Sequence, residues 1–309
     1  MQTTEQVRGI LANYASEPPG VKARLAEILS HGKLGGTGKL VILPVDQGIE
    51  HGPARSFAIN PDGYDPFYHH RLAIEAGLSA YAAPLGQLSV TMGELYGQVP
   101  TILKLNHSNS LSRLKEDADQ AIFASVDDAL RLGATAIGFT IYPGSDRGLE
   151  QMEEIGELIR EARAVGLPTV LWSYPRGGNI SKDGETAIDV VAYAAHLACQ
   201  LGAHIIKVKL PTEFIEQKEA KAEFEANRIP IATQPERVAE VVRSCFNGRR
   251  IVVFSGGAAK GTDAVLADAR AVRDGGGNGC IIGRNSFRRP HDEALKLLDT
   301  LIRIFKGQE

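Results

Sequence analysis

Eight short β-rich segments recur along this chain of 309 residues, and a helical stretch follows each of them. Each segment ends in a loop that contains Gly, Pro, Asn or Asp, the residues that turns favour. The segments cover residues 39–48, 78–86, 99–107, 134–144, 167–177, 203–211, 250–257 and 279–287. Strict alternation of strands and helices predicts parallel strands joined by right-handed crossovers. Eight such units favour an α/β fold of the (β/α)8 TIM-barrel type over an open doubly wound sheet. The first loop, VDQGIEHGP, also lacks the G-x-G-x-x-G fingerprint of dinucleotide-binding sheets.

The stretches between the segments carry helical signals. Residues 148–166 and 185–203 place apolar side chains at i, i+3, i+4 and i+7, the period of an amphipathic helix. Ser125 and Asp128 resemble a capping box at the start of another helix. Five glycines stand just before a segment, where a left-handed helix cap is needed. They are Gly77, Gly133, Gly166, Gly202 and Gly248.

No linker or change of composition divides the chain, so we predict one TIM-barrel domain over residues 1–309. Residues 1–36 are predicted to form an N-terminal helical extension that covers the base of the barrel, which itself spans about 37–309. The loops at 48–66 and 211–234 are unusually long. Barrel enzymes build their sites from the loops that follow the strands, so we expect these two loops beside the site.

Composition excludes several classes of protein. A net charge of -3 and a pI near 6.3 do not suit nucleic acid as the main partner, which requires a basic face. The three cysteines share no close spacing, which predicts neither a zinc motif nor a disulfide framework and suits a reducing cytoplasm. We see no signal peptide and no apolar run of membrane-spanning length, and therefore expect a cytoplasmic protein without a membrane partner.

The sixth segment holds the most informative pair of residues. Alternation along a strand places Lys207 and Lys209 on one face and apolar residues on the other. If the apolar face packs on the outer helices, both lysines point into the barrel, where desolvation and like charge lower a lysine pKa. A neutral amine attacks carbonyl groups. Lys209 lies nearer the loop and is predicted to be the nucleophile, with Lys207 lowering its pKa. The alternative is a different register with both lysines in solvent.

Two other segments offer groups for proton transfer. Trp172 and Tyr174 share a face of the fifth segment, beside the sixth, and a phenol at the mouth of the barrel could move a proton. Packing in the core is an equal alternative for this aromatic pair. Asp46 ends the first segment in an apolar context and could pair with a lysine or act as a base. Its alternative role is to cap the following loop.

The seventh and eighth segments end in glycine-rich loops, which suit a phosphate site. Glycines let backbone N–H groups approach an anion, and barrels often bind phosphate after strands seven and eight. Arginine adds a fixed cationic fork. The residues concerned are Ser255, Gly256 and Gly257 in one loop and Gly283, Arg284 and Asn285 in the other. Two tight turns with a surface arginine are the alternative.

The remaining signals are weaker. Lys104 and Asn106 share a face of the third segment, Tyr142 ends the fourth, and these residues could line the pocket. Arg176 and Lys104 are candidates for holding a second phosphate. A metal site is poorly supported, because His51, His107 and His204 are scattered along the chain. The neighbours His69 and His70 are predicted to lie at the surface.

Taken together, the segments VDQGIEHGPARSF, LSAYAAPLG, FTIYPGS, LWSYPRGG, IIKVKLP, FSGGAAKG and IIGRNSF resemble the archaeal-type class I fructose-bisphosphate aldolases, in their bacterial branch. The resemblance extends from about Leu40 to Arg289. It implies a TIM barrel, no metal and no cofactor, a homo-oligomer and an enzyme of glycolysis and gluconeogenesis. Many archaeal members have Asp-His-Gly where this chain has Gln47 between Asp46 and Gly48, so any role of that histidine is absent here.

The resemblance also implies roles for individual residues. The Schiff-base lysine falls on Lys209, the acid/base residue on Tyr174, and a neighbouring site residue on Trp172. Asp46 matches the acid at the end of the first strand. The phosphate cradle falls on Ser255, Gly256, Gly257, Gly283 and Arg284. The predicted reaction is the reversible cleavage of fructose 1,6-bisphosphate to dihydroxyacetone phosphate and glyceraldehyde 3-phosphate. The alternatives are a related Schiff-base or transaldolase-like enzyme for another phosphorylated ketose, and a non-catalytic sugar-phosphate binding protein.

Overall fold

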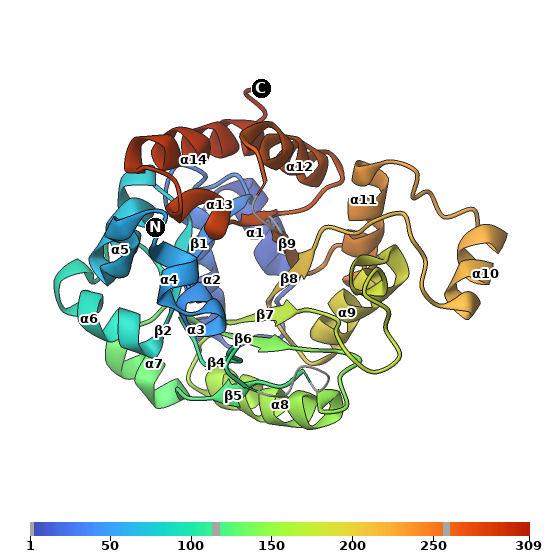
Figure 1. Ribbon diagram of the computed structural model, residues 1–309, viewed down its shortest axis with the longest axis horizontal. Coiled ribbons are helices and arrows are strands. Elements are labelled where there is room, and N and C mark those ends of the chain that lie inside the picture. The colour runs from blue at the N-terminus through green and yellow to red at the C-terminus, as the bar shows by residue number, and fades with distance from the viewer. Residues whose placement is uncertain (1–2, 113–117, 256–259) are drawn as a thin grey trace.

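Parallel strands close into a barrel in the computed structural model, which describes residues 3–112, 118–255 and 260–309 (Figure 1). Its strands are β1 (Leu40–Pro44), β2 (Ala80–Pro84), β3 (Thr101–Lys104), β6 (Ala136–Ile141), β7 (Thr169–Ser173), β8 (Ile205–Lys209), β9 (Ile251–Ser255) and β10 (Gly279–Ile281). They follow one another around the barrel in chain order, and β10 pairs with β1 to close it. Each of the eight predicted segments contains one of these strands, so the TIM-barrel prediction is confirmed.

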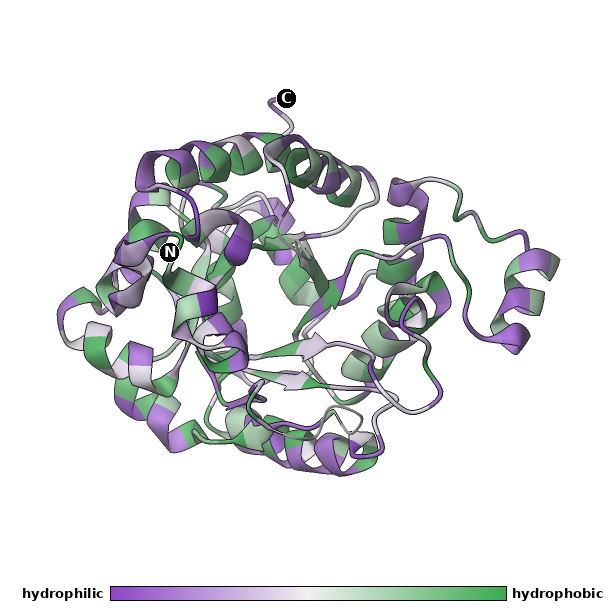
Figure 2. Cartoon of the chain, viewed as in Figure 1, coloured by the Kyte–Doolittle hydropathy of each residue, from purple (hydrophilic) through white to green (hydrophobic). Residues whose placement is uncertain are grey.

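Helices surround the barrel because alternate strand residues are apolar and point outward. On β8, Ile206 and Val208 pack in the outer core with residues of the surrounding helices. The surrounding helices are α5 (Pro66–Ala76), α6 (Leu85–Leu95), α7 (Val126–Leu132), α8 (Gly148–Ala164), α9 (Ile188–Gln200), α11 (Gln234–Ser244), α12 (Thr262–Asp274) and α14 (His291–Phe305). Figure 2 shows the same division by hydropathy, with hydrophilic residues on the outer faces of these helices.

The helix ends follow the local sequence. Ser125 and Asp128 form the predicted capping box at the start of α7, and Thr233 and Glu236 form a second one at α11. The five predicted cap glycines all have positive φ, which costs a glycine little because it has no Cβ. Gly77 and Gly133 are left-handed caps of α5 and α7. These local signals are therefore confirmed.

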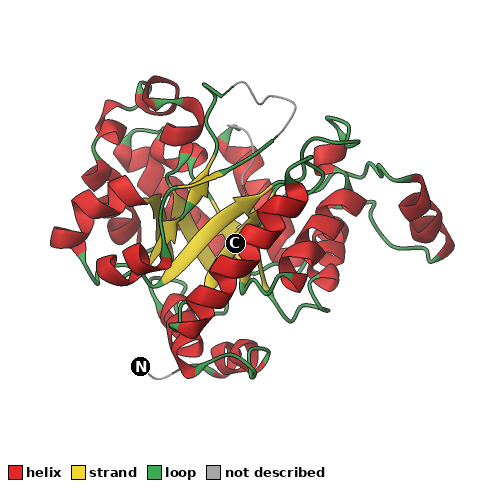
Figure 3. Ribbon diagram, turned by 90° about the horizontal axis from the view of Figure 1, so that it is seen from below, coloured by secondary structure: helices red, strands yellow, loops and turns green. Residues whose placement is uncertain are grey.

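The N-terminal helices α1 (Glu5–Ala12) and α2 (Pro19–Ser30) lie across one end of the strands (Figure 3). Their buried side chains, including Val7, Leu25 and Ile28, share a core cluster with the inward residues of the barrel strands. The hydroxyl of Tyr14 donates to the carbonyl of His204 at 2.6 Å. The helices thus cover the base of the barrel, and any site must open at the other end.

Long loops follow the strands at that other end. The loop after β1 folds into α3 (Gln47–His51), α4 (Pro53–Phe57) and the 3-10 turn η1 (Pro61–Tyr64). After β3, the short strands β4 (Asn106–His107) and β5 (Ala121–Ile122) pair antiparallel. The loop after β7 contains the 3-10 turn η2 (Gly184–Thr186), and α13 (Arg284–Phe287) follows β10. The loop after β8 carries α10 (Lys218–Ala226), which stands away from the barrel (Figure 1). Within the described residues, no helix is both long enough and apolar enough to span a membrane.

Candidate active site

A cavity of about 490 Å³ opens at the carboxyl ends of the strands. Nine of the eleven residues predicted for the site line this one cavity. They are Asp46, Trp172, Tyr174, Arg176, Lys207, Lys209, Ser255, Gly283 and Arg284. The other two, Gly256 and Gly257, lie outside the described residues. The structure therefore brings these nine residues together at one end of the barrel.

The lysines of β8 point into the barrel but stand in different surroundings. Lys207 is 5 % exposed, and its Nζ lies 5.1 Å from the ring centre of Trp172 and 5.5 Å from that of Tyr174. Burial, aided by the charge of Arg284, lowers the pKa of Lys207 to about 8, against the opposing charges of Asp46 and Glu50. The amine of Lys207 therefore loses its proton far more readily than that of an exposed lysine.

Lys209 lies one layer nearer the mouth and is held by a carboxylate. Its Nζ is 2.9 Å from Oε2 of Glu185, on the turn η2. Burial lowers the pKa of Lys209, but the hydrogen bond and charge of Glu185 oppose that shift. The charges of Arg176 and Lys182 lower the pKa of Lys209 further. The charge of Lys207 instead lowers the pKa of Lys104. The two lysines therefore do not form the like-charge pair that the sequence suggested.

Lys104 is a third lysine inside the barrel, 1 % exposed. Its Nζ donates to the backbone carbonyl of Asn106 at 2.6 Å and lies 5.5 Å from the ring centre of Trp172. Burial lowers the pKa of Lys104 to about 8, and the charge of Asp46 opposes the shift. Lys104 is thus buried below the site and is not among the residues that line the cavity.

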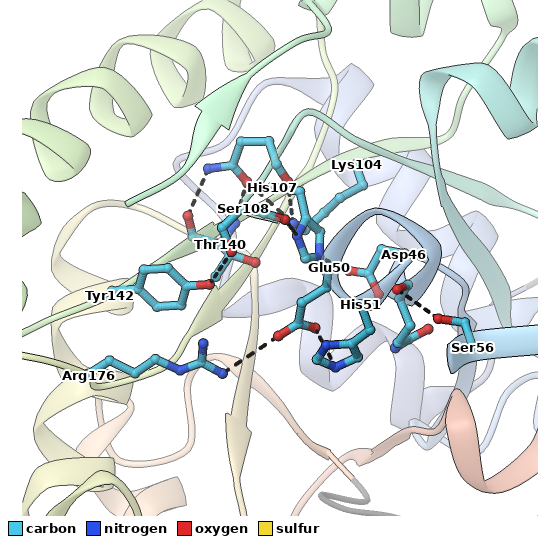
Figure 4. A network of polar contacts seen from close by, with 12 residues as sticks. Asp46, Glu50, His51, Ser56, Lys104, His107, Ser108, Thr140, Tyr142 and Arg176 are labelled. Carbon is cyan, nitrogen blue, oxygen red and sulfur yellow. Dashed lines mark hydrogen bonds and ion pairs between the residues drawn. The ribbon is translucent and has the colours of Figure 1, made fainter. Parts of the chain in front are cut away.

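Asp46 is 8 % exposed just after β1, and the ring of His107 lies beside its carboxylate. Nε2 of His107 lies 3.4 Å from Oδ2 of Asp46, and Figure 4 shows these residues with Lys104 and Glu50 in one polar network. Burial alone would raise the pKa of Asp46. The hydrogen bond from His107 and the charges of Lys104 and Lys207 outweigh burial, so the pKa of Asp46 falls well below its usual range. Asp46 is therefore an anion at the centre of the site.

Tyr174 follows β7 and turns its phenol toward β9. The phenol hydrogen-bonds the side chain of Ser255. Burial raises the pKa of Tyr174, so its hydroxyl keeps its proton at neutral pH and is able to donate it. Trp172, 1 % exposed, forms the floor between Tyr174 and the lysines.

The phosphate candidates meet at the ends of β9 and β10. Ser255 ends β9, and Gly283 and Arg284 follow β10 directly. A Cβ on Gly283 would lie 2.6 Å from the carbonyl oxygen of Pro44, so only glycine fits where this loop approaches β1. Lys260 also lines the cavity, and its backbone N–H donates to Oδ1 of Asn285 at 2.9 Å. Cations and backbone therefore converge on one end of the cavity.

A second cavity of about 730 Å³ adjoins the first. Glu50, His107, Tyr142, Arg176, Lys182 and Glu185 line both. The guanidinium of Arg176 lies 4.9 Å from the ring centre of Tyr142 and 3.9 Å from Oε1 of Glu50 (Figure 4). Arg176 and Lys182 therefore lie where the two cavities meet, and Lys260 and Arg284 line only the first cavity.

The sequence did not predict Glu50 or Glu185 as site residues, and it gave His107 no role beside Asp46. His107 ends the third predicted segment and Glu50 follows the first by two residues, which is a signal that could have marked them. Glu185 offered no such signal, because it reaches the cavity only through the fold of the loop after β7.

The histidines predicted for the surface are buried, so that prediction was wrong. His69 and His70 are both fully buried on α5. His69 packs against Phe57 and Phe287, and His70 hydrogen-bonds Thr91 at 2.8 Å. Burial lowers the pKa of each to about 4, so both are neutral core side chains. No group of three His, Cys, Asp or Glu suited to a metal ion occurs among the described residues.

Comparisons with known proteins agree with this arrangement. The family model for DeoC/LacD family aldolases matches residues 40–289. A probable fructose-bisphosphate aldolase class 1 of Chlamydia muridarum is 36 % identical, over 91 % of this chain and 83 % of that protein. A fructose-bisphosphate aldolase class 1 of Thermoproteus tenax is 36 % identical, over 87 % of this chain and 90 % of the relative. A solved structure of a Schiff-base-forming fructose-1,6-bisphosphate aldolase superposes with a TM-score of 0.73 at 32 % identity, covering 96 % of this chain and 98 % of the other.

Proposed function

This chain belongs to the DeoC/LacD family of aldolases, within the class 1 fructose-bisphosphate aldolases, and from this premise we infer its reaction and the residues that perform it. The protein is an aldehyde-lyase that reversibly cleaves fructose 1,6-bisphosphate to dihydroxyacetone phosphate and glyceraldehyde 3-phosphate. The observation that carries this conclusion is the amine of Lys207, buried in a cavity that further cationic side chains line. A ketose with two phosphates matches those cations.

We propose Lys207, in place of Lys209, as the residue that forms the Schiff base. Attack on a ketone requires a neutral amine. Burial lowers the pKa of both lysines, but Lys209 is ion-paired at 2.9 Å with Glu185, which favours its protonated form. Lys207 has no such ion pair among the described residues, and its Nζ lies over the rings of Trp172 and Tyr174. Peptide mapping of a reduced adduct decides between the two lysines.

The reaction then follows from the surrounding groups. Lys207 attacks the C2 ketone, and loss of water gives an iminium that withdraws electrons from the C3–C4 bond. The C4 hydroxyl proton passes to solvent at the open end of the cavity, the C3–C4 bond breaks and the aldehyde leaves; solvent later returns a proton to Tyr174 after that phenol has protonated the enamine. The anion of Asp46 stabilises the iminium cation, and the protonated phenol of Tyr174 is the proposed donor to the enamine. Hydrolysis frees dihydroxyacetone phosphate and restores the amine.

The two phosphates have separate proposed positions. Ser255, Gly283 and Arg284 lie at the end of the cavity nearest β9 and β10, where we place the C1 phosphate. Arg176, which lines both cavities, is the proposed partner of the distal phosphate. Lys104 donates to the backbone carbonyl of Asn106 and lines neither cavity, so it is no longer favoured for that role.

The finer predictions from the sequence stand as proposals. We propose that residues 1–309 act as one domain, that the enzyme works in the cytoplasm in glycolysis and gluconeogenesis, and that it forms a homo-oligomer. Sedimentation equilibrium would test the last of these, because a monomer at micromolar concentration would contradict it.

One experiment tests the proposed function directly. The protein is incubated with dihydroxyacetone phosphate and reduced with borohydride, and intact-mass spectrometry is expected to show one reduced adduct per chain. Cleavage of fructose 1,6-bisphosphate is expected to survive dialysis against EDTA, because the iminium replaces the Lewis acid of metal-dependent aldolases. Absence of the adduct, or activity that vanishes with EDTA and returns with zinc, would contradict the proposal.

A further inference from the structure

His107 is held at the junction of the two cavities by contacts on both sides of its ring. It is 7 % exposed and lines both spaces. The side-chain amide of the preceding residue, Asn106, makes two hydrogen bonds with the backbone of Thr140. Its Nδ2 donates to the carbonyl at 2.8 Å, and its Oδ1 accepts the N–H at 2.7 Å. This pairing fixes β4 against β6, so the imidazole has a defined place beside Asp46 (Figure 4).

The two ring nitrogens of His107 both face oxygen atoms. Nδ1 lies 2.7 Å from the backbone carbonyl of Ser108, which only accepts hydrogen bonds, so Nδ1 carries a proton. Nε2 lies 3.4 Å from Oδ2 of Asp46, and an ionised carboxylate also only accepts. A neutral ring has a proton on only one nitrogen, so its other nitrogen would point a lone pair at an oxygen that also only accepts. A doubly protonated ring places an N–H toward both oxygens.

The charges around His107 favour the second state. From β1 and α3 it faces Asp46, Glu50 and His51, and from β3 it faces Lys104. Tyr142, after β6, reaches it through Ser108, whose hydroxyl lies 3.2 Å from the phenol oxygen. Glu50 is already 3.9 Å from the guanidinium of Arg176, and Lys104 donates to Asn106. Asp46 is thus the anion without a direct cationic partner among the described residues unless His107 is charged.

We propose that His107 is an imidazolium in the resting enzyme and acts as the positioning residue of Asp46, orienting its carboxylate and balancing its charge so that Lys207 is free to lose its proton. This inference rests on the proposed function, in which Lys207 must be neutral to attack. The charge of Asp46 raises the pKa of Lys207, against burial and the charge of Arg284. A cation at residue 107 would balance part of the charge of Asp46, so its loss is expected to raise the pKa of that amine further. Sequence reasoning considered His107 only as a metal ligand and did not connect it with Asp46.

Two variants separate the charge of His107 from its hydrogen bond. His107→Gln retains a neutral N–H donor that is able to reach Asp46, so the plateau of kcat/KM at high pH is expected to stay within about threefold of the parent. The rising limb of its pH profile is expected to move up by roughly one unit, and activity at pH 7 to fall about tenfold and recover above pH 9. His107→Asn loses the donor to Asp46 as well, and its plateau is expected to fall by a further factor of roughly ten.

A matched control is His196→Asn, because Nδ1 of His196 also faces a carbonyl, that of Ser244 at 2.8 Å, but on α9 outside the barrel. This variant should keep both the plateau and the midpoint of the parent. A merely structural role of His107 would lower the plateau without moving the midpoint. An unmoved midpoint in His107→Gln overturns the charge-balancing role, and unchanged plateaus in both His107 variants overturn the orienting role.

A spectroscopic measurement decides the protonation state without using activity. The ring nitrogens of ¹⁵N-histidine-labelled protein are recorded at pH 7, and the signals of His107 are assigned by their loss in His107→Gln. Two protonated nitrogens are expected in the parent and a neutral ring in Asp46→Asn. A neutral His107 in the parent overturns the inference. If the parent protein neither cleaves fructose 1,6-bisphosphate nor forms a reduced adduct, the proposed function fails, while the nitrogen spectrum still reports on His107.

Discussion

The mouth and the base of the barrel each hold a buried histidine whose Nε2 lies 3.4 Å from a carboxylate oxygen, His107 with Asp46 and His204 with Glu17. The pairs consist of the same two groups at the same separation. They differ in what the other ring nitrogen contacts and in what surrounds the carboxylate. We infer from that difference that the pair at the mouth belongs to the active site and that the pair at the base is structural.

At the base, the other ring nitrogen and the carboxylate are held by hydrogen bonds. Nδ1 of His204 accepts the backbone N–H of Thr169 at 3.0 Å, so the ring carries its one proton on Nε2, toward Glu17. Glu17 also accepts two hydrogen bonds from Arg163, at 2.8 and 3.1 Å. Contact with His204 and Arg163 outweighs burial and lowers the pKa of Glu17 to about 2. The network joins the N-terminal extension to the barrel, and we expect it to have no part in the reaction.

At the mouth, the far nitrogen of His107 faces an acceptor, and the carboxylate faces a cavity. The buried lysines Lys104 and Lys207 and the partly buried Lys209 approach this region, although burying an ammonium group costs free energy. Such an arrangement destabilises the fold locally and lowers the lysine pKa values. We therefore expect substitutions at the mouth to change activity with little loss of stability, and substitutions at the base to do the reverse.

The largest effect is expected from Lys207→Met. Loss of the nucleophile should lower kcat by about 10⁵-fold or more and abolish trapping by borohydride. Because an apolar side chain replaces a buried amine, the free energy of unfolding should stay the same or rise. Lys209→Met is the matched variant, and its kcat should fall by no more than about tenfold. An adduct that maps to Lys209 in the parent would return the assignment to the residue that the sequence favoured.

Tyr174→Phe should give the next largest effect. The variant keeps the ring and loses only the proton donor, so kcat should fall by about 10²–10⁴-fold with little change in substrate binding. The lost step is proton transfer, so the variant should still form a borohydride-reduced adduct with dihydroxyacetone phosphate. Near-normal kcat would make Tyr174 a packing residue, and Asp46 with His107 would become the leading proton carriers.

Arg284→Ala should have a smaller effect of a different kind. The guanidinium binds phosphate in the ground state and the transition state alike, so its loss should mainly raise KM. A charge-assisted contact of about 1.5–3 kcal/mol corresponds to a ten- to hundredfold loss of kcat/KM. Steady-state kinetics on fructose 1,6-bisphosphate measure the split. A fall in kcat at unchanged KM would place Arg284 in the chemical step instead.

Local sequence rules accounted for most of the fold. Alternation in IIKVKLP was enough to predict that both lysines of β8 point inward, because the side-chain period of a strand is two. Glycine caps and the capping box at Ser125 were likewise predictable, because each depends on residues only three or four apart.

The sequence failed where a residue's environment depends on contacts far along the chain. The choice between Lys207 and Lys209 turns on Glu185, which the loop after β7 brings within 2.9 Å of Lys209. His107 and Asp46 are 61 positions apart and meet only because β3 and β1 end on the same face of the barrel. The surface prediction failed for His69 because Phe57, in the loop after β1, and Phe287, on α13, cover it. It failed for His70 because Tyr81 on β2 and Thr91 on α6 pack against that ring.

The smallest effect on activity, and the one that tests the base, is expected from Glu17→Gln. The variant loses an ionic contact with Arg163, so its free energy of unfolding should fall by about 2 kcal/mol at pH 7, while kcat stays within twofold of the parent.

The pH dependence of stability should also change in Glu17→Gln. Because folding lowers the pKa of Glu17 from 4.5 to about 2, its contribution is fully present above pH 4.5 and is lost as pH falls toward 2. The parent should therefore lose more stability than the variant across that range, as urea denaturation at several pH values would show. If Glu17→Gln instead lowered kcat while remaining folded, the base would be coupled to the site, and the division between joint and active site would not hold.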